Sequence, residues 1–288
     1  MSFDNAYEAI TEENDSRWAF GTGFAEPLSG VDTTIPSGVD GDELAAYCLM
    51  LGDDALVMSH RLQEWITRAP ELEEEVALAN IGLDLLGQAR LLLARAGRAE
   101  GAGRGEDELA FFRAEHEFRN VRLAEQTDAD FAGVIARLLV FSTWRLALLG
   151  RLVTSRDPVL AAIADKGVKE LTYHRDYAAQ WTLRLGDGTE FSRERMRDGL
   201  AAVWPFVGEL FTPHPIELRL TGVAVDPSVL WAEFDEVLGK VLPLATLDRP
   251  KARGGAGPLG RDGTHTEAMA ELLATLQSVP RAHPGATW

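Results

Sequence analysis

The stretch VALANIGLDLLGQARLLLARAG, residues 76–97, decides the fold of this chain. Pro70 precedes it and suits the first position of a helix, and the glutamates that follow Pro70 suit the positive end of a helix dipole. A glycine-rich run over 97–105 ends the pattern. The sequence therefore predicts one long amphipathic helix. Its apolar residues recur at steps of three and four, the spacing of one helix face: Leu72, Val76, Ala79, Leu83 and Leu86.

Three further stretches carry helical patterns of similar length. DELAAYCLMLGDDALVMSHRLQEWITR (42–68) contains no proline, and FAGVIARLLVFSTWRLALLGRLV (131–153) is strongly apolar. PVLAAIADKGVKELTYHRDYAAQWTLRLG (158–186) follows Asp157, a suitable N-cap, and opens with proline. No alternating β-type runs meet at Asn-Gly turns. Four long helices with short connections predict an all-α fold, a four-helix bundle.

Shorter helices are predicted around this bundle, at 107–125, 192–210, 227–245 and 264–281. The last opens with Thr264 and Glu267 at the spacing of a capping box. The result is one helical domain over 42–288 with additional C-terminal helices. Four tryptophans belong to its core or to an interface, with the core favoured for most of them: Trp65, Trp144, Trp181 and Trp204.

Residues 1–41 differ from this domain in composition. They are rich in Gly, Ser, Thr, Asp and Glu and show no sustained period. Three aromatics, Trp18, Phe20 and Phe24, are scattered among them. The segment is interpreted as an extended or partly disordered arm that a partner orders, or alternatively as an untethered tail.

The charge balance excludes several classes of function. The 288 residues include 28 Lys and Arg against 45 Asp and Glu, a net charge of −17, which argues against nucleic acid and anionic membrane surfaces as partners. The longest run without a charged residue is ten residues, 199–208, whereas a membrane span needs about 20. The first fifteen residues are acidic and lack the basic start of a signal peptide, and Cys48 is a single cysteine in an apolar run. These features predict a cytoplasmic protein.

A four-helix bundle often holds two metal ions, with a Glu on each of two helices and a Glu-x-x-His pair on each of the others. None of the six histidines has a Glu three residues before it. Glu170 and His174 share a helix face, but one such pair does not make a di-metal site. Asn80, Asp84 and Gln88 form a polar stripe on the second long helix. This stripe is either the remnant of a site, the favoured interpretation, or a network that fixes helix register.

Other motifs for catalysis are weak. The chain has no Gly-x-Ser-x-Gly elbow and no P-loop. The loop RPKARGGAGPLGRDG (249–263) carries four basic residues among glycines, but without the strand–loop–helix context of a phosphate site. A flexible surface loop is the favoured interpretation.

Four stretches of the chain carry a family resemblance. LGDDALVMSHRLQEW (51–65) and APELEEEVALANIGLDLLGQAR (69–90) closely resemble the C subunits of bacterial phenylacetyl-CoA epoxidases. SRDPVLAAIADKGVKELTYHRDYAAQW (155–181) and HTEAMAELLATLQSVPRAHPGATW (265–288) resemble the same family. The resemblance covers 42–288 and implies a ferritin-like helical fold. It also implies a non-catalytic, structural role in a di-iron monooxygenase complex that epoxidises the aromatic ring of phenylacetyl-CoA in aerobic phenylacetate catabolism.

The same resemblance implies the partners and cofactors of the complex. The catalytic A subunit would hold the di-iron centre and bind the acyl-CoA, pair with this chain, and be linked by a small B subunit. A separate reductase with flavin and an iron–sulfur cluster would take electrons from NADPH. No cofactor is implied for this chain.

The related catalytic subunit can be compared with this chain by position. Its second helix reads D-E-A-G-H over 84–88, so that its metal-binding Glu falls on Leu85 and its His on Gln88. Its later K-E-E-S-F-H falls on 169–174, so that the His remains as His174 while its Glu is replaced by Leu171. The resemblance thus implies that this chain has lost most of the ligands.

The two remaining helices complete this comparison. The Glu of the first helix falls on Leu62, and Ser142 stands on the third helix where relatives tend to have Asp. Leucine offers no lone pair to iron, and apolar atoms in the space avoid an unpaired buried charge. The degenerate metal site implied in this way comprises Leu62, Asp84, Leu85, Gln88, Ser142, Glu170, Leu171 and His174.

Two alternatives from other classes stay open. A stand-alone ferritin-like di-metal oxidase or iron store, with ligands not recognised here, would need at least four inward carboxylates. Only Glu64, Asp84 and Glu170 are plausible members of such a set. A binding module whose bundle cavity holds an acyl chain or an aromatic compound would instead be stabilised by its ligand.

Overall fold

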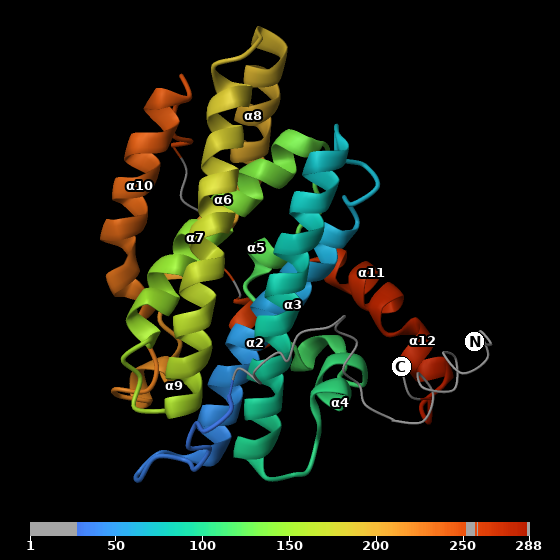
Figure 1. The fold of residues 1–288 in the computed structure, drawn as a ribbon, viewed down its shortest axis with the longest axis vertical. Helices are drawn as coiled ribbons and strands as arrows, with labels where there is room; N and C mark the ends of the chain where they lie inside the picture. The colour runs from blue at the N-terminus through green and yellow to red at the C-terminus, as the bar shows by residue number, and fades with distance from the viewer. Residues whose placement is uncertain (1–27, 252–256, 258, 287–288) are drawn as a thin grey trace, which may run out of the picture. The chain divides into compact units, whose positions relative to one another are not determined.

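The computed structural model describes residues 28–251, 257 and 259–286, and every regular element among them is helical. α2 packs along α3, and α6 along α7, while contacts between α3 and α7 join the two pairs (Figure 1). This arrangement confirms the predicted all-α four-helix bundle. The four long helices are α2 (Gly41–Gln63), α3 (Leu72–Glu100), α6 (Phe131–Leu152) and α7 (Pro158–Gly186).

Smaller helices pack against this bundle. α8 contacts both α6 and α7, α10 contacts the same two helices, and α11 contacts α2. The α-helices among them are α4 (Glu106–Phe111), α5 (Arg122–Glu125), α8 (Glu190–Val203), α9 (Pro215–Arg219), α10 (Trp231–Leu244), α11 (Glu267–Leu276) and α12 (Ser278–Ala282). The 3₁₀ helices are η1 (Glu115–Glu117), η2 (Trp204–Phe211), η3 (Pro227–Leu230) and η4 (Gly260–Asp262).

Side-chain caps fix the starts of three long helices. Asp157 accepts a hydrogen bond from the Leu160 N–H, as its place before Pro158 predicts. Asp130 caps α6 in the same way, and Asp40 accepts from the first backbone N–H groups of α2. Each carboxylate satisfies donors that have no partner within the helix, and its negative charge suits the positive helix end.

Two predicted helix boundaries are wrong by several residues. α2 ends at Gln63 instead of near 68, and α3 begins at Leu72 with Pro70 in the preceding turn. A proline disfavours the helical conformation of the residue before it, so the chain turns here before α3 begins. The predicted capping box at 264–267 is also wrong, because Thr266 stands at the N-cap of α11.

The predicted single helix over 107–125 is instead the three short pieces α4, η1 and α5. Two carboxylates of α2 explain the interruption. Asp53 accepts a hydrogen bond from the Arg119 N–H at 2.8 Å, and Asp54 accepts one from the Val121 N–H at 2.8 Å. These backbone donors therefore bond to another helix and not within a continuous helix of their own.

Buried apolar side chains fill the space between the four long helices. α6 supplies a large share of them, and Trp144 on this helix is 1% exposed and donates its indole N–H to the Leu210 carbonyl. Trp65 and Trp204 are buried and Trp181 is half-buried, which confirms the core as the place of most of the four tryptophans.

By length and composition alone, α3 and α6 would each be long and apolar enough to cross a membrane. The most apolar 18-residue window of α6 has a mean hydropathy of 1.6 and is 94% buried inside the protein, so its apolar surface is used in packing. The corresponding window of α3 has a mean hydropathy of 1.4 and is only 44% buried.

Residues 31–40, within the predicted arm, lie against the helical domain. Arg95 of α3 donates hydrogen bonds to the carbonyls of Thr33 and Thr34, and Arg156 donates one to the Ser37 carbonyl. Residues 1–27 of the predicted arm lie outside the described residues.

Candidate functional site

The eight positions of the implied degenerate site lie on the four long helices, with Leu62 on α2 and Ser142 on α6. Asp84 and Glu170 are half-buried, while the other six side chains are buried. The hydroxyl of Ser142 donates to the Leu138 carbonyl of its own helix at 2.6 Å. The remaining polar members form contacts between helices.

The first of these contacts joins α3 to α7. Asp84 and His174 approach to 3.0 Å between Oδ2 and Nε2. The His174 side chain is fully buried, whereas the Asp84 side chain is 38% exposed at the surface of the bundle. The pair therefore links α3 to α7, with its histidine in the bundle interior and its aspartate at the surface.

The second contact centres on Gln88 of α3. Its amide nitrogen donates to Oε2 of Glu170 on α7 at 2.9 Å, and its amide oxygen accepts from Nε of Arg145 on α6 at 3.1 Å. Arg145 in turn donates to the Leu51 carbonyl of α2 at 3.2 Å. One side-chain network thus connects all four long helices. The sequence analysis did not single out Arg145, although a lone arginine within the apolar run 138–149 was a usable signal.

Arg145 places a positive charge in the centre of the bundle. The side chain is fully buried, and burial is the main cause that lowers its pKa to about 10, while the nearby Asp54 carboxylate opposes the shift. The guanidinium is therefore still protonated at neutral pH. Its Nη1 lies 3.9 Å from Oδ2 of Asp54, so that a carboxylate of α2 offsets part of its charge.

Two adjacent carboxylates of α2, Asp53 and Asp54, carry the charge balance of this interior. Arg261 donates to both Asp54 oxygens, at 3.0 and 2.8 Å, and Arg113 pairs with Asp53. Arg261 is only 5% exposed, so the expected flexible surface loop over 249–263 is wrong at this end. Residues 252–256 and 258 of that loop lie outside the described residues. Sequence reasoning missed this cluster because its partners are far apart along the chain.

This interior does not fit the ligand set of a di-iron centre. Leu62, Leu85 and Leu171 are each fully buried where the comparison by position places three glutamates, and they offer no lone pairs. Among the residues that the structure describes, no three His, Cys, Asp or Glu side chains are grouped so that they could hold a metal ion. The guanidinium of Arg145 would also repel a cation in the same space.

Comparison with known proteins decides the family. The family described as "Phenylacetic acid catabolic protein" matches residues 32–288. The chain belongs to this family. A relative from Escherichia coli (strain K12), named as the C subunit of 1,2-phenylacetyl-CoA epoxidase, is 45% identical over 250 residues, which are 86% of this chain and 100% of that protein. The ferritin-like helical fold that the resemblance implies is confirmed, as is the resemblance itself.

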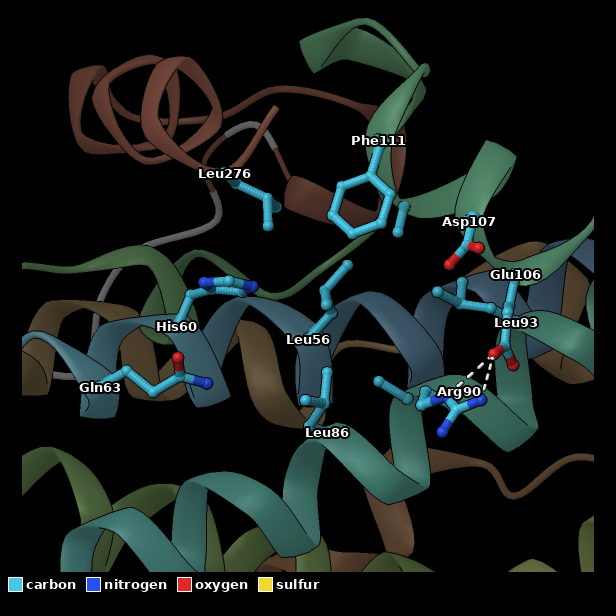
Figure 2. A pocket seen from close by; sticks show the side chains of 12 residues that line it. Leu56, His60, Gln63, Leu86, Arg90, Leu93, Glu106, Asp107, Phe111 and Leu276 are labelled. Atoms are coloured by element: carbon cyan, nitrogen blue, oxygen red, sulfur yellow. Dashed lines mark hydrogen bonds and ion pairs between the residues drawn. The ribbon is translucent and has the colours of Figure 1, made fainter. Parts of the chain in front are cut away.

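This member of the phenylacetic acid catabolic protein family also has a pocket beside its bundle, between α2, α3, α4 and α11 (Figure 2). Its volume is about 330 Å³, and its walls are mainly apolar. His60 points into it, and its pKa is lowered to about 4, chiefly by burial, so the ring is neutral. Arg90 and Glu106 form an ion pair of 2.7 Å at its rim. The alternative of a binding module places its ligand inside the four-helix bundle. This pocket lies outside that interior.

Proposed function

We propose that this chain is the non-catalytic structural subunit of a 1,2-phenylacetyl-CoA epoxidase, and that it pairs with and stabilises the catalytic A subunit. One observation carries the proposal. The buried arginine Arg145, and not a set of carboxylates, occupies the centre of the bundle, and leucines stand at the ligand positions. The name of the Escherichia coli relative supports the assignment to the epoxidase.

The other components follow from the same proposal. The di-iron centre and the acyl-CoA site belong to the A subunit, a small B subunit links the A–C pairs, and a reductase with flavin and an iron–sulfur cluster supplies electrons from NADPH. The complex is cytoplasmic, and nucleic acid and membrane are not among its partners. The net charge of −17 supports both exclusions.

The physical contribution of such a subunit is burial of a partner's apolar helices. Obligate interfaces commonly bury more than about 2,000 Å². Substitutions at their centre should therefore reduce assembly before they affect the chemistry of the catalytic subunit.

Iron content after metal loading tests the proposal. The purified full-length chain is incubated anaerobically with Fe(II) and desalted, and iron per chain is measured beside the A subunit treated in the same way. We expect iron near zero in this chain, retention of iron by the A subunit, and co-purification of the two when they are co-expressed. Iron near two per chain would instead favour the alternative, a stand-alone ferritin-like di-metal oxidase with ligands not recognised here.

We also propose that the N-terminal arm wraps a neighbouring subunit, because its aromatics, Trp18, Phe20 and Phe24, stand in a polar segment. Removal of residues 1–27 is the appropriate test, since Thr33 and Thr34 provide carbonyls for Arg95 and should be kept. The expected result is weaker complex formation with unchanged unfolding of the isolated chain. Unchanged complex formation would exclude this role.

A further inference from the structure

Three large apolar side chains of α3 are exposed on one face of the helix. Leu72, Val76 and Leu83 have 69%, 52% and 61% of their surface exposed. Ala79 and Gly87 continue the same face at steps of three and four residues. We refer to these five residues as the α3 face. The spacing that identified this helix in the sequence therefore belongs to a face that the described residues leave uncovered.

Gly87 adds a helical glycine to this face. A glycine within a helix lowers stability by about 1 kcal/mol relative to alanine, so it needs a reason. At Gly167 a methyl group would lie 2.5 Å from Leu149, and at Gly97 it would lie 2.0 Å from the Arg104 carbonyl. At Gly87 no described atom lies within 4 Å of such a methyl group. Glycine at this position serves no packing within the described chain and leaves room for close approach from outside.

The border of the α3 face is acidic at its N-terminal end. Glu73 follows Leu72 directly and Glu75 follows two residues later, and Asp84 borders the face near its middle with 38% of its side chain exposed. Arg90, a basic residue in line with the face, is paired with Glu106. A partner surface that matches this border is apolar at its centre and carries Lys or Arg opposite the glutamates.

The pocket described above adjoins the α3 face. Leu86, on the flank of the face, and Arg90, at its end, both line the pocket, as Figure 2 shows. An apolar helix surface beside a pocket of about 330 Å³ is the arrangement in which protein interfaces place an anchor side chain.

We propose that the α3 face docks an apolar, basic-flanked helix of the catalytic A subunit, with one large apolar side chain of that helix seated in the pocket. This inference rests on the proposed function and adds to it the surface on which the two subunits pair. Gly87 is the point of closest approach between the helices, because a residue without a side chain lets two backbones come near. The glutamates after Leu72 set the orientation of the partner helix.

Binding of full-length variants to the purified A subunit tests this assignment. Leu83→Glu places a charge at the centre of the face, and Gly87→Leu fills the close approach. The Leu83 side chain is 61% exposed, and a methyl group at Gly87 meets no described atom within 4 Å. Leu244→Glu, at a 70% exposed leucine at the end of α10, is the matched control. We expect both α3 variants to bind the A subunit at least about tenfold more weakly, and the control to bind like wild type. Circular dichroism should be the same for all four proteins, and no variant should unfold at a clearly lower temperature than wild type. Gly87→Leu should be somewhat more stable, because leucine is a better helix former than glycine.

Each other outcome decides against part of the assignment. Wild-type affinity in both α3 variants would overturn the α3 face as the docking surface and leave the proposed function standing. Failure of the wild-type chain itself to bind the A subunit would overturn both. A dimer of the isolated chain that Leu83→Glu separates, as seen by light scattering, would assign the face to a second copy of this chain instead.

Discussion

α3 and α6 are similar in sequence character and opposite in their surroundings. The mean hydropathies of their most apolar windows are 1.4 and 1.6, yet 44% of the first window and 94% of the second are buried. Contacts with α7, α8 and α10 cover α6 within the chain. Hydropathy therefore indicates how much apolar surface must be covered, but not which chain covers it.

The polar residues of the two helices sharpen this contrast. α3 directs Gln88 into the bundle, where it bonds to Glu170 and Arg145, while Leu83 is exposed on its outer side. α6 is buried on nearly all sides and carries the charge of Arg145 into the bundle interior among apolar residues. α3 thus directs a polar side chain into the bundle among mostly apolar ones, and it leaves large apolar side chains exposed on its outer side.

The largest effect is expected when the central charge of α6 is removed. Arg145→Met deletes the donors to Gln88 and Leu51 and leaves buried acceptors unpaired, although Asp54 keeps Arg261. We expect the free energy of unfolding to fall by about 3 kcal/mol. Urea denaturation followed by circular dichroism measures it.

Leu83→Ala on α3 is the control for this substitution, because its side chain is 61% exposed. It should change the free energy of unfolding by less than about 0.5 kcal/mol. If the two variants lost the same free energy of unfolding, the contrast between a buried α6 and a partly exposed α3 would not hold.

A matched pair of glycine substitutions gives an intermediate effect of opposite sign. Gly167→Ala brings a methyl group to 2.5 Å from Leu149 of α6 and should lower the free energy of unfolding by about 2 kcal/mol. Gly87→Ala on α3 meets no described atom and should raise it by about 1 kcal/mol. Thermal or urea unfolding of both variants in one experiment compares them. A loss of stability in Gly87→Ala would show that the α3 face is packed in the isolated chain.

The smallest expected effect is a change of stability with pH. It should differ between Arg145 on α6 and His265 in the C-terminal segment. Arg145 stays charged below its pKa of about 10, so its contribution is constant from acid to neutral pH. Burial lowers the pKa of His265, but its bonds to Glu125 and to the Phe118 carbonyl outweigh burial and raise it above 6.5. A raised pKa stabilises the folded state fully below the unfolded value, and this stability is lost as pH rises through the folded value.

His265→Gln tests this difference in pH dependence. The gap in unfolding free energy between wild type and this variant should be larger at about pH 5.5 than at about pH 9, as urea denaturation at both pH values would measure. A gap that stays constant, or that grows with pH, would contradict a stabilising imidazolium at His265.

Much of the fold was accessible from the sequence because it depends on neighbours along the chain. The four long helices follow from apolar spacing, and the start of α7 follows from Asp157 before Pro158. The predicted polar stripe on α3 is present for Asp84 and Gln88, which bond to His174 and Glu170, whereas Asn80 is exposed. The helix over 107–125 was mispredicted because its backbone donors bond to α2.

The candidate site was accessible only in part. Comparison by position pointed to Leu62, Leu85 and Leu171, and all three are buried apolar side chains. The buried positions of Arg145 and Arg261 were not predicted, because a sequence does not distinguish a buried, paired arginine from an exposed one until its partner is known. Arg261 bonds to Asp54 across 207 residues of sequence, and no local pattern connects them.

The sequence by itself determined which segments are helical, that the chain lacks Glu-x-x-His pairs, and which family its motifs resemble. Helical hydrogen bonds join residues four apart, and motifs are read at fixed spacing, so both are local properties. Only the tertiary structure decided that Arg145 takes the centre of the bundle and that the α3 face points outward. Burial and charge pairing depend on segments that meet only when the chain has folded, so the spacing that identified α3 could not say which of its faces would be covered.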